Sequence, residues 1–346
     1  MGILFEKYRS GMNLGGWISQ CKYEKEHIAE FIKEDDVKKI ASWGCDHIRL
    51  PFDYPVLESD SAPFVYLEEG FAVIDKVLKW CKSTGLNLVL DLHKAPGYAF
   101  HNAAEENILF TDETAQKRFI SLWEEFTRRY KNEGDNVIFE LMNEIVDPHG
   151  ETWNNIARRA IDAIHAIDPN RYILLGGPYF NASVGLATLE IYDNPRVLYN
   201  FHSYEPLYVT HQNAYWTKLK DTGIKQPYPG KAEGLEILKP LMDGSAAFPY
   251  VDENTFFDKD YIEKCIADAI AFTKKHGKEL YCGEYGAIDK ADLQSRINYI
   301  RDINEVFEKH RMGRALWTYK RMDFPSIDEN GEAVSPELVE ILGVKK

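Results

Sequence analysis

Two glutamates, Glu144 and Glu284, have the clearest capacity for chemistry in this sequence, and each follows a short apolar segment, residues 137–141 and 280–282. Cleavage of a glycosidic bond needs one carboxylic acid to protonate the leaving oxygen and a second carboxylate to attack the sugar or activate water. If the two segments are strands lying nearly opposite each other in a closed sheet, the carboxylates can face one another across a sugar ring. The pair therefore predicts glycoside cleavage.

Other polar or aromatic residues also follow apolar segments: Arg49, His93, Asn143, His202, Tyr204 and Trp317. In a parallel barrel the carboxyl ends of all strands meet at one face, which holds the active site. Each residue alone has a structural interpretation, such as a hydrogen-bonded core histidine or a buried ion pair. Coincidence at six strand ends is improbable, so the set predicts one site.

The two carboxylates must titrate differently. We expect Arg49 and Tyr204 to hold Glu284 ionised through charge and hydrogen bonding. We expect Glu144 to stay protonated in a less solvated pocket. Glu205 is a rival carboxylate, but it begins a long loop.

The remaining residues suit sugar binding. Asn143 is predicted to donate to a sugar 2-hydroxyl, and His93 and His202 to bind hydroxyls or orient the carboxylates. Trp317 offers a flat apolar face for a pyranose ring. Two further acids within strands, Asp91 and Glu140, are interpreted as supporting polar groups.

Eight short apolar segments are candidate strands: residues 11–14, 48–50, 86–92, 137–141, 172–175, 197–201, 280–282 and 315–317. Nearly continuous apolar strands are typical of a parallel sheet covered on both faces. Helical periodicity separates many of them, at residues 71–81, 119–130, 156–167, 262–270 and 297–307. This alternation predicts an α/β fold, a (β/α)8 TIM barrel in which residues 1–346 form a single catalytic domain.

Residues 203–258 interrupt the alternation with five prolines and many aromatic side chains. We expect an insertion subdomain after the sixth strand. A long insertion at the carboxyl end of a strand overhangs the catalytic face of a barrel.

The net charge of −14 argues against nucleic acid as a partner and is compatible with a neutral polysaccharide. The five cysteines are widely spaced, without a C-x-x-C pair, so reduced thiols are expected, and neither a metal nor a cofactor. No apolar run is long enough for a membrane helix. The first nine residues hold no signal-like apolar run, so we expect a cytoplasmic monomer, or a secreted one if a leader has been removed.

Six segments resemble glycoside hydrolase family 5 of clan A: IRLPFDYP, LVLDLHKAPG, FELMNE, NFHSYEP, YCGEYGA and LWTYKRMDF. The resemblance runs from Gly11 to the region of Asp323. All eight residues of the family set have a match, in order: Arg49, His93, Asn143, Glu144, His202, Tyr204, Glu284 and Trp317. The resemblance implies a retaining mechanism with Glu144 as acid/base and Glu284 as nucleophile.

Within the family, the chain looks most like bacterial endoglucanases that carry a subdomain between strand six and its helix. That likeness implies hydrolysis of β-1,4 or mixed β-1,3-1,4 glucans. One departure is Lys94, where many members have a second histidine, and it makes the substrate less certain. Four aromatic residues are candidate outer platforms for sugar rings: Trp17, Tyr98, Phe100 and Trp216.

Three alternatives stay open. A mannanase or an exo-β-1,3-glucanase of the same family would use the same glutamates with different subsites. A metal-dependent barrel hydrolase would use His93, His202 and an acid, but the first strand lacks the His-x-His that this class usually has. A non-catalytic sugar-binding barrel would have no need of two opposed carboxylates.

Overall fold

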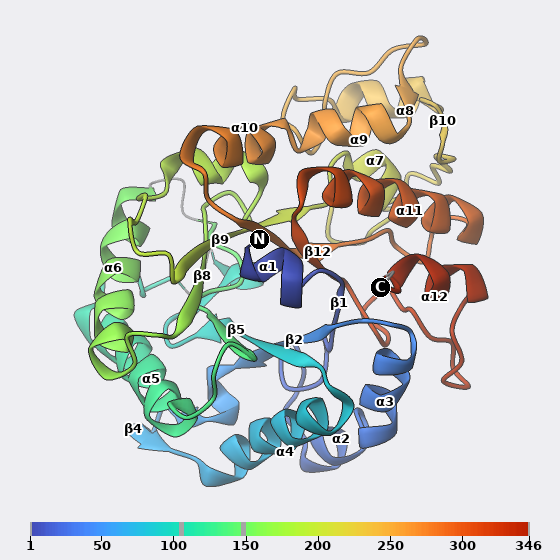
Figure 1. Cartoon of the computed structure of the whole chain (residues 1–346). Helices are drawn as coiled ribbons and strands as arrows, with labels where there is room; N and C mark the ends of the chain where they lie inside the picture. Colours follow the sequence, from blue (N-terminus) through green and yellow to red (C-terminus); the bar gives the residue numbers. More distant parts are fainter. Residues whose placement is uncertain (1, 104–106, 147–149, 345–346) are drawn as a thin grey trace.

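The structure, a computed structural model, describes residues 2–103, 107–146 and 150–344. Its centre is a closed sheet of eight parallel strands, which confirms the predicted (β/α)8 barrel (Figure 1). The barrel strands are β1 (Gly11–Asn13), β2 (His47–Asp53), β5 (Asn87–Ala95), β7 (Val137–Glu140), β8 (Tyr172–Gly176), β9 (Val197–Ser203), β12 (Leu280–Tyr285) and β13 (Gly313–Leu316). Their order is β2-β1-β13-β12-β9-β8-β7-β5, and pairing of β2 with β5 closes the barrel.

Helices surround this sheet in Figure 1. The longer ones are α3 (Glu34–Ser42), α4 (Glu68–Thr84), α5 (Glu113–Tyr130), α6 (Gly150–Ile167), α10 (Ala267–His276) and α11 (Leu293–His310). Shorter helices are α1 (Ile3–Lys7), α2 (Lys25–Glu30), α9 (Lys259–Cys265), α12 (Pro336–Leu342), η1 (Tyr54–Val56), η2 (Phe100–Asn102) and η3 (Ser183–Thr188). Within the described residues, none of the helices has both the length and the apolar character needed to cross a bilayer.

The helix ends follow local sequence signals. Asp112 and Asp292 cap α5 and α11 by accepting hydrogen bonds from backbone N–H groups in the first turn. Gly85 ends α4 in the left-handed conformation, where a side chain would be strained. The single helix predicted over residues 262–270 is wrong, because the backbone leaves helical geometry at Ile266 and separates α9 from α10.

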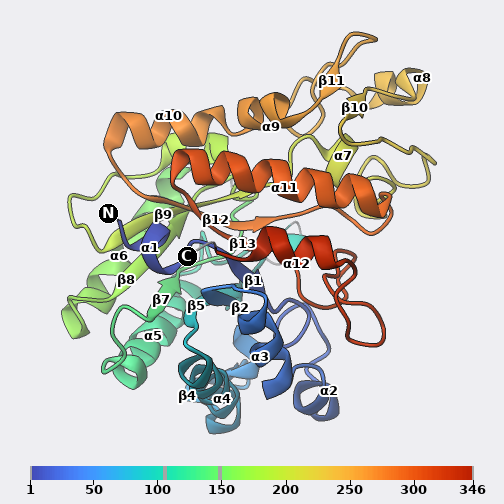
Figure 2. The ribbon, with the colours of Figure 1, turned by 45° about the vertical axis from the view of Figure 1, so that its right-hand side comes forward.

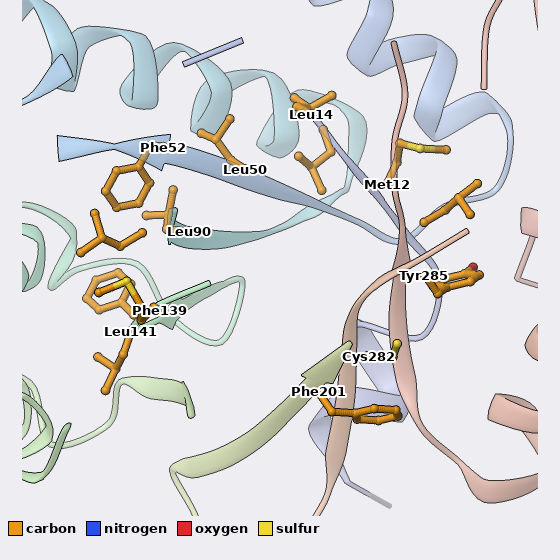
Figure 3. Packing of buried hydrophobic residues seen from close by; sticks show 14 of the residues in the cluster. Met12, Leu14, Leu50, Phe52, Leu90, Phe139, Leu141, Phe201, Cys282 and Tyr285 are labelled. Atoms are coloured by element: carbon orange, nitrogen blue, oxygen red, sulfur yellow. The ribbon is translucent and has the colours of Figure 1, made fainter. Parts of the chain in front are cut away.

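The apolar strands are buried on both sides. All seven residues of β2 and of β9 are buried, including the polar residues Arg49 and His202 that the site uses. Figure 3 shows Leu50, Phe52 and Leu90 among the side chains of the main hydrophobic core. A smaller cluster contains Val89, Ile138, Leu174, Leu198, Tyr281 and Ala315 from the strands together with Leu4 and Tyr8 from the amino-terminal segment. The scaffold that positions the site is therefore packed through its centre.

The chain between β9 and α9 holds little regular structure. It contains α7 (Leu207–Thr210), β10 (Gly230–Lys231), α8 (Leu235–Leu238), η4 (Lys239–Leu241) and β11 (Phe256–Phe257), and β10 pairs antiparallel with β11. In Figures 1 and 2, β10 and α8 extend outward beyond α9 and α11. Three small strands lie elsewhere, at β3 (Glu58–Ser59), β4 (Ala62–Tyr66) and β6 (Tyr98–Ala99). That residues 203–258 are an insertion subdomain stays a prediction.

Candidate active site

Arg49 lies deeper in the barrel than the sequence indicated. The expected strand ended near Leu50, but β2 continues to Asp53, because residues 51–53 still pair with β5. The expectation that Arg49 ends its strand is therefore wrong. Its side chain is fully buried and extends to polar groups of neighbouring strands.

The Arg49 guanidinium connects several acids. Its Nε and one terminal nitrogen donate to both oxygens of Glu140, each at 2.7 Å. Its other hydrogen bonds go to Glu284 Oε1 at 2.8 Å and to Asn143 Oδ1 and Asn13 Oδ1 at 2.9 Å, and Asp91 Oδ2 lies 3.1 Å away. Burial raises the pKa of Asp91 and of Glu140 to about 7, although the Arg49 charge opposes this shift. We call this group of Arg49, Asp91, Glu140 and Asn143 the Arg49 network.

Glu144 and Glu284 come together above this network. Glu144 follows β7, and Glu284 lies near the carboxyl end of β12. Three atoms lie within 4.8 Å of one another: a side-chain oxygen of Glu144, a side-chain oxygen of Glu284 and a ring nitrogen of His202. Only 9% of Glu144 and 5% of Glu284 is exposed, so both carboxyl groups act in a largely dry environment. The sequence-predicted pair is therefore adjacent in space.

The surroundings of the two carboxyl groups favour different protonation states. Burial and the negative charge of Glu284 raise the pKa of Glu144 well above its usual value. Burial also raises the pKa of Glu284, but the Arg49 charge and hydrogen bond oppose the shift, and the Tyr204 hydroxyl donates to Glu284 Oε2 at 3.1 Å. A single proton shared by the pair therefore resides on Glu144, and Glu284 carries the charge.

Both predicted histidines contact acids of the site. His202 Nδ1 lies 2.9 Å from Glu144 Oε1, and His93 Nδ1 lies 2.7 Å from Asp91 Oδ2. Burial lowers the pKa of His93 to about 4 and that of His202 well below its usual value, so both rings are neutral near pH 7. The His93 ring stacks on Trp317, with centroids 5.7 Å apart and planes 7° from parallel.

A cleft of about 880 Å³ opens over these residues. Its lining includes six of the eight predicted site residues, namely His93, Glu144, His202, Tyr204, Glu284 and Trp317. Arg49 and Asn143 are buried and do not line it. Within the described part of the chain, Asn143 Nδ2 and His202 Nε2 are buried without a hydrogen-bond partner. Buried polar atoms are rarely left unpaired in native proteins, so these two atoms mark the site as unusual.

The predicted aromatic platforms are partly wrong. Phe100 and Trp216 line the cleft, but Trp17 and Tyr98 are buried, with exposures of 1% and 0%. The Trp17 indole N–H donates to the backbone carbonyl of Ile28 in α2. Tyr98 instead supports the backbone of Glu144, because its hydroxyl donates to the Glu144 carbonyl at 2.7 Å.

Sequence reasoning missed several aromatic residues of the cleft: Tyr179, Phe180, His211, Tyr215 and Phe324. They lie in loops between elements, where no periodic pattern marks a side chain as facing the cleft. Tyr179 and Phe180 have positive φ angles of 61° and 57°, which is unusual for such bulky residues. The missed set forms much of the cleft wall.

Two other predictions bear on the chemistry. Glu205 lines the cleft, but its carboxylate accepts a hydrogen bond from the Tyr204 backbone N–H at 3.1 Å. Among the described residues, the one group of acids, histidines or cysteines close enough to bind a metal is Glu144, His202 and Glu284. This group lacks His93, on which the metal-dependent alternative relied.

A (β/α)8 barrel with two adjacent buried carboxyl groups in its cleft has the architecture of a glycoside hydrolase. Residues 10–323 match the family model for cellulase, glycosyl hydrolase family 5. The chain belongs to this family and is a glycoside hydrolase.

Relatives match over most of their length. Endoglucanase C of Acetivibrio thermocellus is 41% identical over 345 residues, covering 98% of this chain and 99% of the relative. Cellodextrinase A of Ruminococcus flavefaciens is 40% identical over 306 residues, covering 88% of this chain and 83% of the relative. Among solved structures, an endoglucanase of the hyperthermophile Thermotoga maritima has a TM-score of 0.76 at 24% identity, covering 99% of this chain and 100% of that one. At 24% identity, the likeness to this solved structure shows a shared fold alone.

Proposed function

We propose that the chain is a retaining endo-β-glucanase that hydrolyses β-1,4 or mixed β-1,3-1,4 glucans by double displacement. The observation that carries the proposal is the approach of Glu144 and Glu284 to within 4.8 Å. Retaining enzymes place their carboxyl groups about 5–5.5 Å apart, whereas inverting enzymes need about 6.5–9.5 Å to admit a water. The relatives named endoglucanase and cellodextrinase support a β-glucan as the substrate.

In the first step, the Glu284 carboxylate attacks the anomeric carbon as the glycosidic C–O bond breaks. Glu144 gives its proton to the departing oxygen, and a covalent glycosyl ester forms on Glu284. Arg49 and Tyr204 keep Glu284 ionised until attack, through the hydrogen bonds at 2.8 and 3.1 Å.

In the second step, Glu144 must change from acid to base. Ester formation removes the negative charge of Glu284, which after burial is the largest cause of the raised Glu144 pKa. The pKa of Glu144 therefore falls in the intermediate, and its carboxylate can take a proton from the attacking water. Cleavage of the ester releases the sugar with its original anomeric configuration.

The other predicted residues would bind the sugar. Asn143 and His202 supply polar atoms beside the pair, and Trp317 supplies the apolar surface on which a ring can stack. We further propose that residues 203–258 are an insertion that extends the cleft, and that the chain acts as a monomer without nucleic acid or membrane.

The stereochemistry of the product tests this mechanism. Proton NMR of a fresh digest should show the β-anomer first, and initial α-anomer would overturn the retaining assignment. Replacement of Glu284 by Gly should abolish hydrolysis, and added azide should restore turnover and give the α-glycosyl azide. Glu205→Gly is the matched control and should keep hydrolysis without azide.

Substrate comparison separates the family alternatives. Lichenan and carboxymethyl cellulose should be cut internally, with a rapid fall in viscosity. Preferential cleavage of glucomannan would indicate a mannanase, and release of single glucose units from laminarin an exo-β-1,3-glucanase. Binding of glucan without any product would indicate a sugar-binding barrel.

A further inference from the structure

His211 is a buried titratable residue in the cleft wall that the mechanism above does not use. It directly follows α7, is 8% exposed and lines the cleft. The Thr210 hydroxyl donates to the Tyr204 carbonyl, and the Thr210 oxygen lies 3.0 Å from His211 Nδ1. Because a hydroxyl has one proton, Nδ1 must carry the proton in this second hydrogen bond. Burial lowers the pKa of His211 to about 3, so the ring is neutral at working pH.

The His211 ring packs against Tyr204. The two rings meet edge to face, with centroids 5.0 Å apart and planes at 87°. Phe324 contacts both, at 5.8 Å from Tyr204 and 5.3 Å from His211. Two rings from separate chain segments thus limit rotation of the Tyr204 side chain, whose hydroxyl reaches Glu284 Oε2.

We propose that His211 is a positioning residue, which holds the Tyr204 ring in the orientation that lets its hydroxyl donate to Glu284. The inference rests on the proposed role of Glu284 as nucleophile. A hydrogen bond to a carboxylate stabilises its ionised form, so loss of this contact raises the pKa of Glu284. A displacement of about 1 Å at a catalytic group is enough to slow an enzyme strongly.

The other groups that act on Glu284 come from elements other than the loop that holds His211. They are Arg49 from β2, Asp91 and His93 from β5, Glu144 after β7 and His202 from β9. The aromatic neighbours of His211, namely Tyr204, Trp216 and Phe324, carry no charge at neutral pH. A substitution at His211 therefore changes Glu284 through Tyr204.

A merely structural role makes a different prediction. The His211 ring also contacts Trp216, at 5.7 Å and 81°, and Trp216 is 46% exposed in the cleft. If His211 only supported Trp216, its loss would raise KM for long glucans and leave the pH profile unchanged.

The test is the pH profile of kcat/KM with 4-nitrophenyl β-cellobioside. His211→Ala should lower kcat/KM about tenfold, as for the loss of one aromatic contact. It should also move the acid limb, which is the fall of kcat/KM at low pH as Glu284 becomes protonated, to higher pH. Tyr204→Phe should shift the same limb, and the double variant should have the acid limb of Tyr204→Phe alone. His211→Phe keeps a planar ring and should keep the parent's acid limb.

His276→Ala is the matched control. His276 also packs on an aromatic ring, at 4.9 Å from Phe272, but it lies at the end of α10 and does not line the cleft. This variant should keep the parent profile. If His211→Ala lacks the parent's circular dichroism, His211→Leu takes its place, since it fills the volume without a planar ring.

An unchanged acid limb in the folded His211 variant, or additive shifts in the double variant, would overturn the positioning role. A different result would reject the proposed function, namely substantial hydrolysis by the Glu284→Gln variant. An inactive Glu284→Gln variant combined with an unshifted His211→Ala variant would leave the mechanism intact and reject only this inference.

Discussion

The Arg49 network beneath the cleft and the aromatic wall above it are built in opposite ways. In the network, Arg49 is fully buried and its partners are fixed by hydrogen bonds of 2.7–2.9 Å. In the wall, Phe180 and Trp216 are 52% and 46% exposed and stand on loops. The network stabilises the charge of Glu284, the proposed nucleophile, whereas the wall offers apolar surface to the proposed substrate. Catalysis should therefore depend on the first region and substrate length preference on the second.

The largest effect should follow from breaking the network. Arg49→Met leaves Asp91, Glu140 and Glu284 buried without their cation, which should lower the free energy of unfolding by about 3–5 kcal/mol. Because the pKa of Glu284 rises without Arg49, the acid limb of kcat/KM should also move to higher pH. Urea denaturation and pH-rate profiles measure the two effects.

Arg171→Met is the control for this prediction. Arg171 is similarly buried, but it donates to backbone carbonyls of residues 130–137, pairs with Asp168 and directly precedes β8, away from Glu284. Its loss should destabilise the fold and leave the acid limb unchanged. Equal acid limbs in the two folded variants would contradict the special role of the network.

A second prediction concerns the charge coupling between the two glutamates. Because the negative charge of Glu284 raises the pKa of Glu144, Glu284→Gln should lower the Glu144 pKa. Carbon-13 NMR of labelled glutamate follows this titration. Glu205 also raises the Glu144 pKa, with a smaller influence, so Glu205→Gln should lower it less. A Glu144 pKa unaffected by Glu284→Gln would disprove the switch from acid to base.

The smallest effect should come from the wall. The Phe180 backbone N–H donates to the carbonyl of Ile145, which directly follows the proposed acid Glu144, and Phe180 lines the cleft. Phe180→Ala should raise KM for carboxymethyl cellulose about three- to tenfold by loss of aromatic surface, with little change for an aryl cellobioside.

Phe64→Ala is matched to that variant. Phe64 is 45% exposed and also has a positive φ, of 66°, but it lies in β4 and does not line the cleft. It should leave KM unchanged for both substrates. An equal rise in the two variants would mean that the exposed Phe180 ring does not contact the glucan.

The same contrast explains what could be predicted from sequence. The barrel and the convergence of the site residues other than Arg49 follow from apolar segments that must be buried on both faces, because the polar residues at the ends of such strands meet at one face. The depth of Arg49 was missed, because Pro51 and Phe52 extend β2 without a change in apolar pattern. The break at Ile266 was missed because the apolar period continues across it.

Apart from Phe100 and Trp216, the aromatic cleft wall could not be predicted, because its residues lie in loops whose course depends on tertiary contacts. Trp17 and Tyr98 had the composition expected of platforms but pack inward. The position of His211 in the cleft wall could not be predicted from the sequence, because a single histidine outside an apolar repeat gives no indication of which way its side chain faces. The boundaries of the proposed insertion and the cellular location stay predictions.

The most direct test of the central claim is labelling with a 2-deoxy-2-fluoro-β-cellobiosyl inactivator, followed by mass spectrometry of the peptides. The fluorine slows breakdown of the glycosyl ester, so the nucleophile stays modified. The account predicts one label, on Glu284, and its absence in Glu284→Gln. A label on Glu205 or Glu144, or inactivation without any covalent adduct, would contradict it.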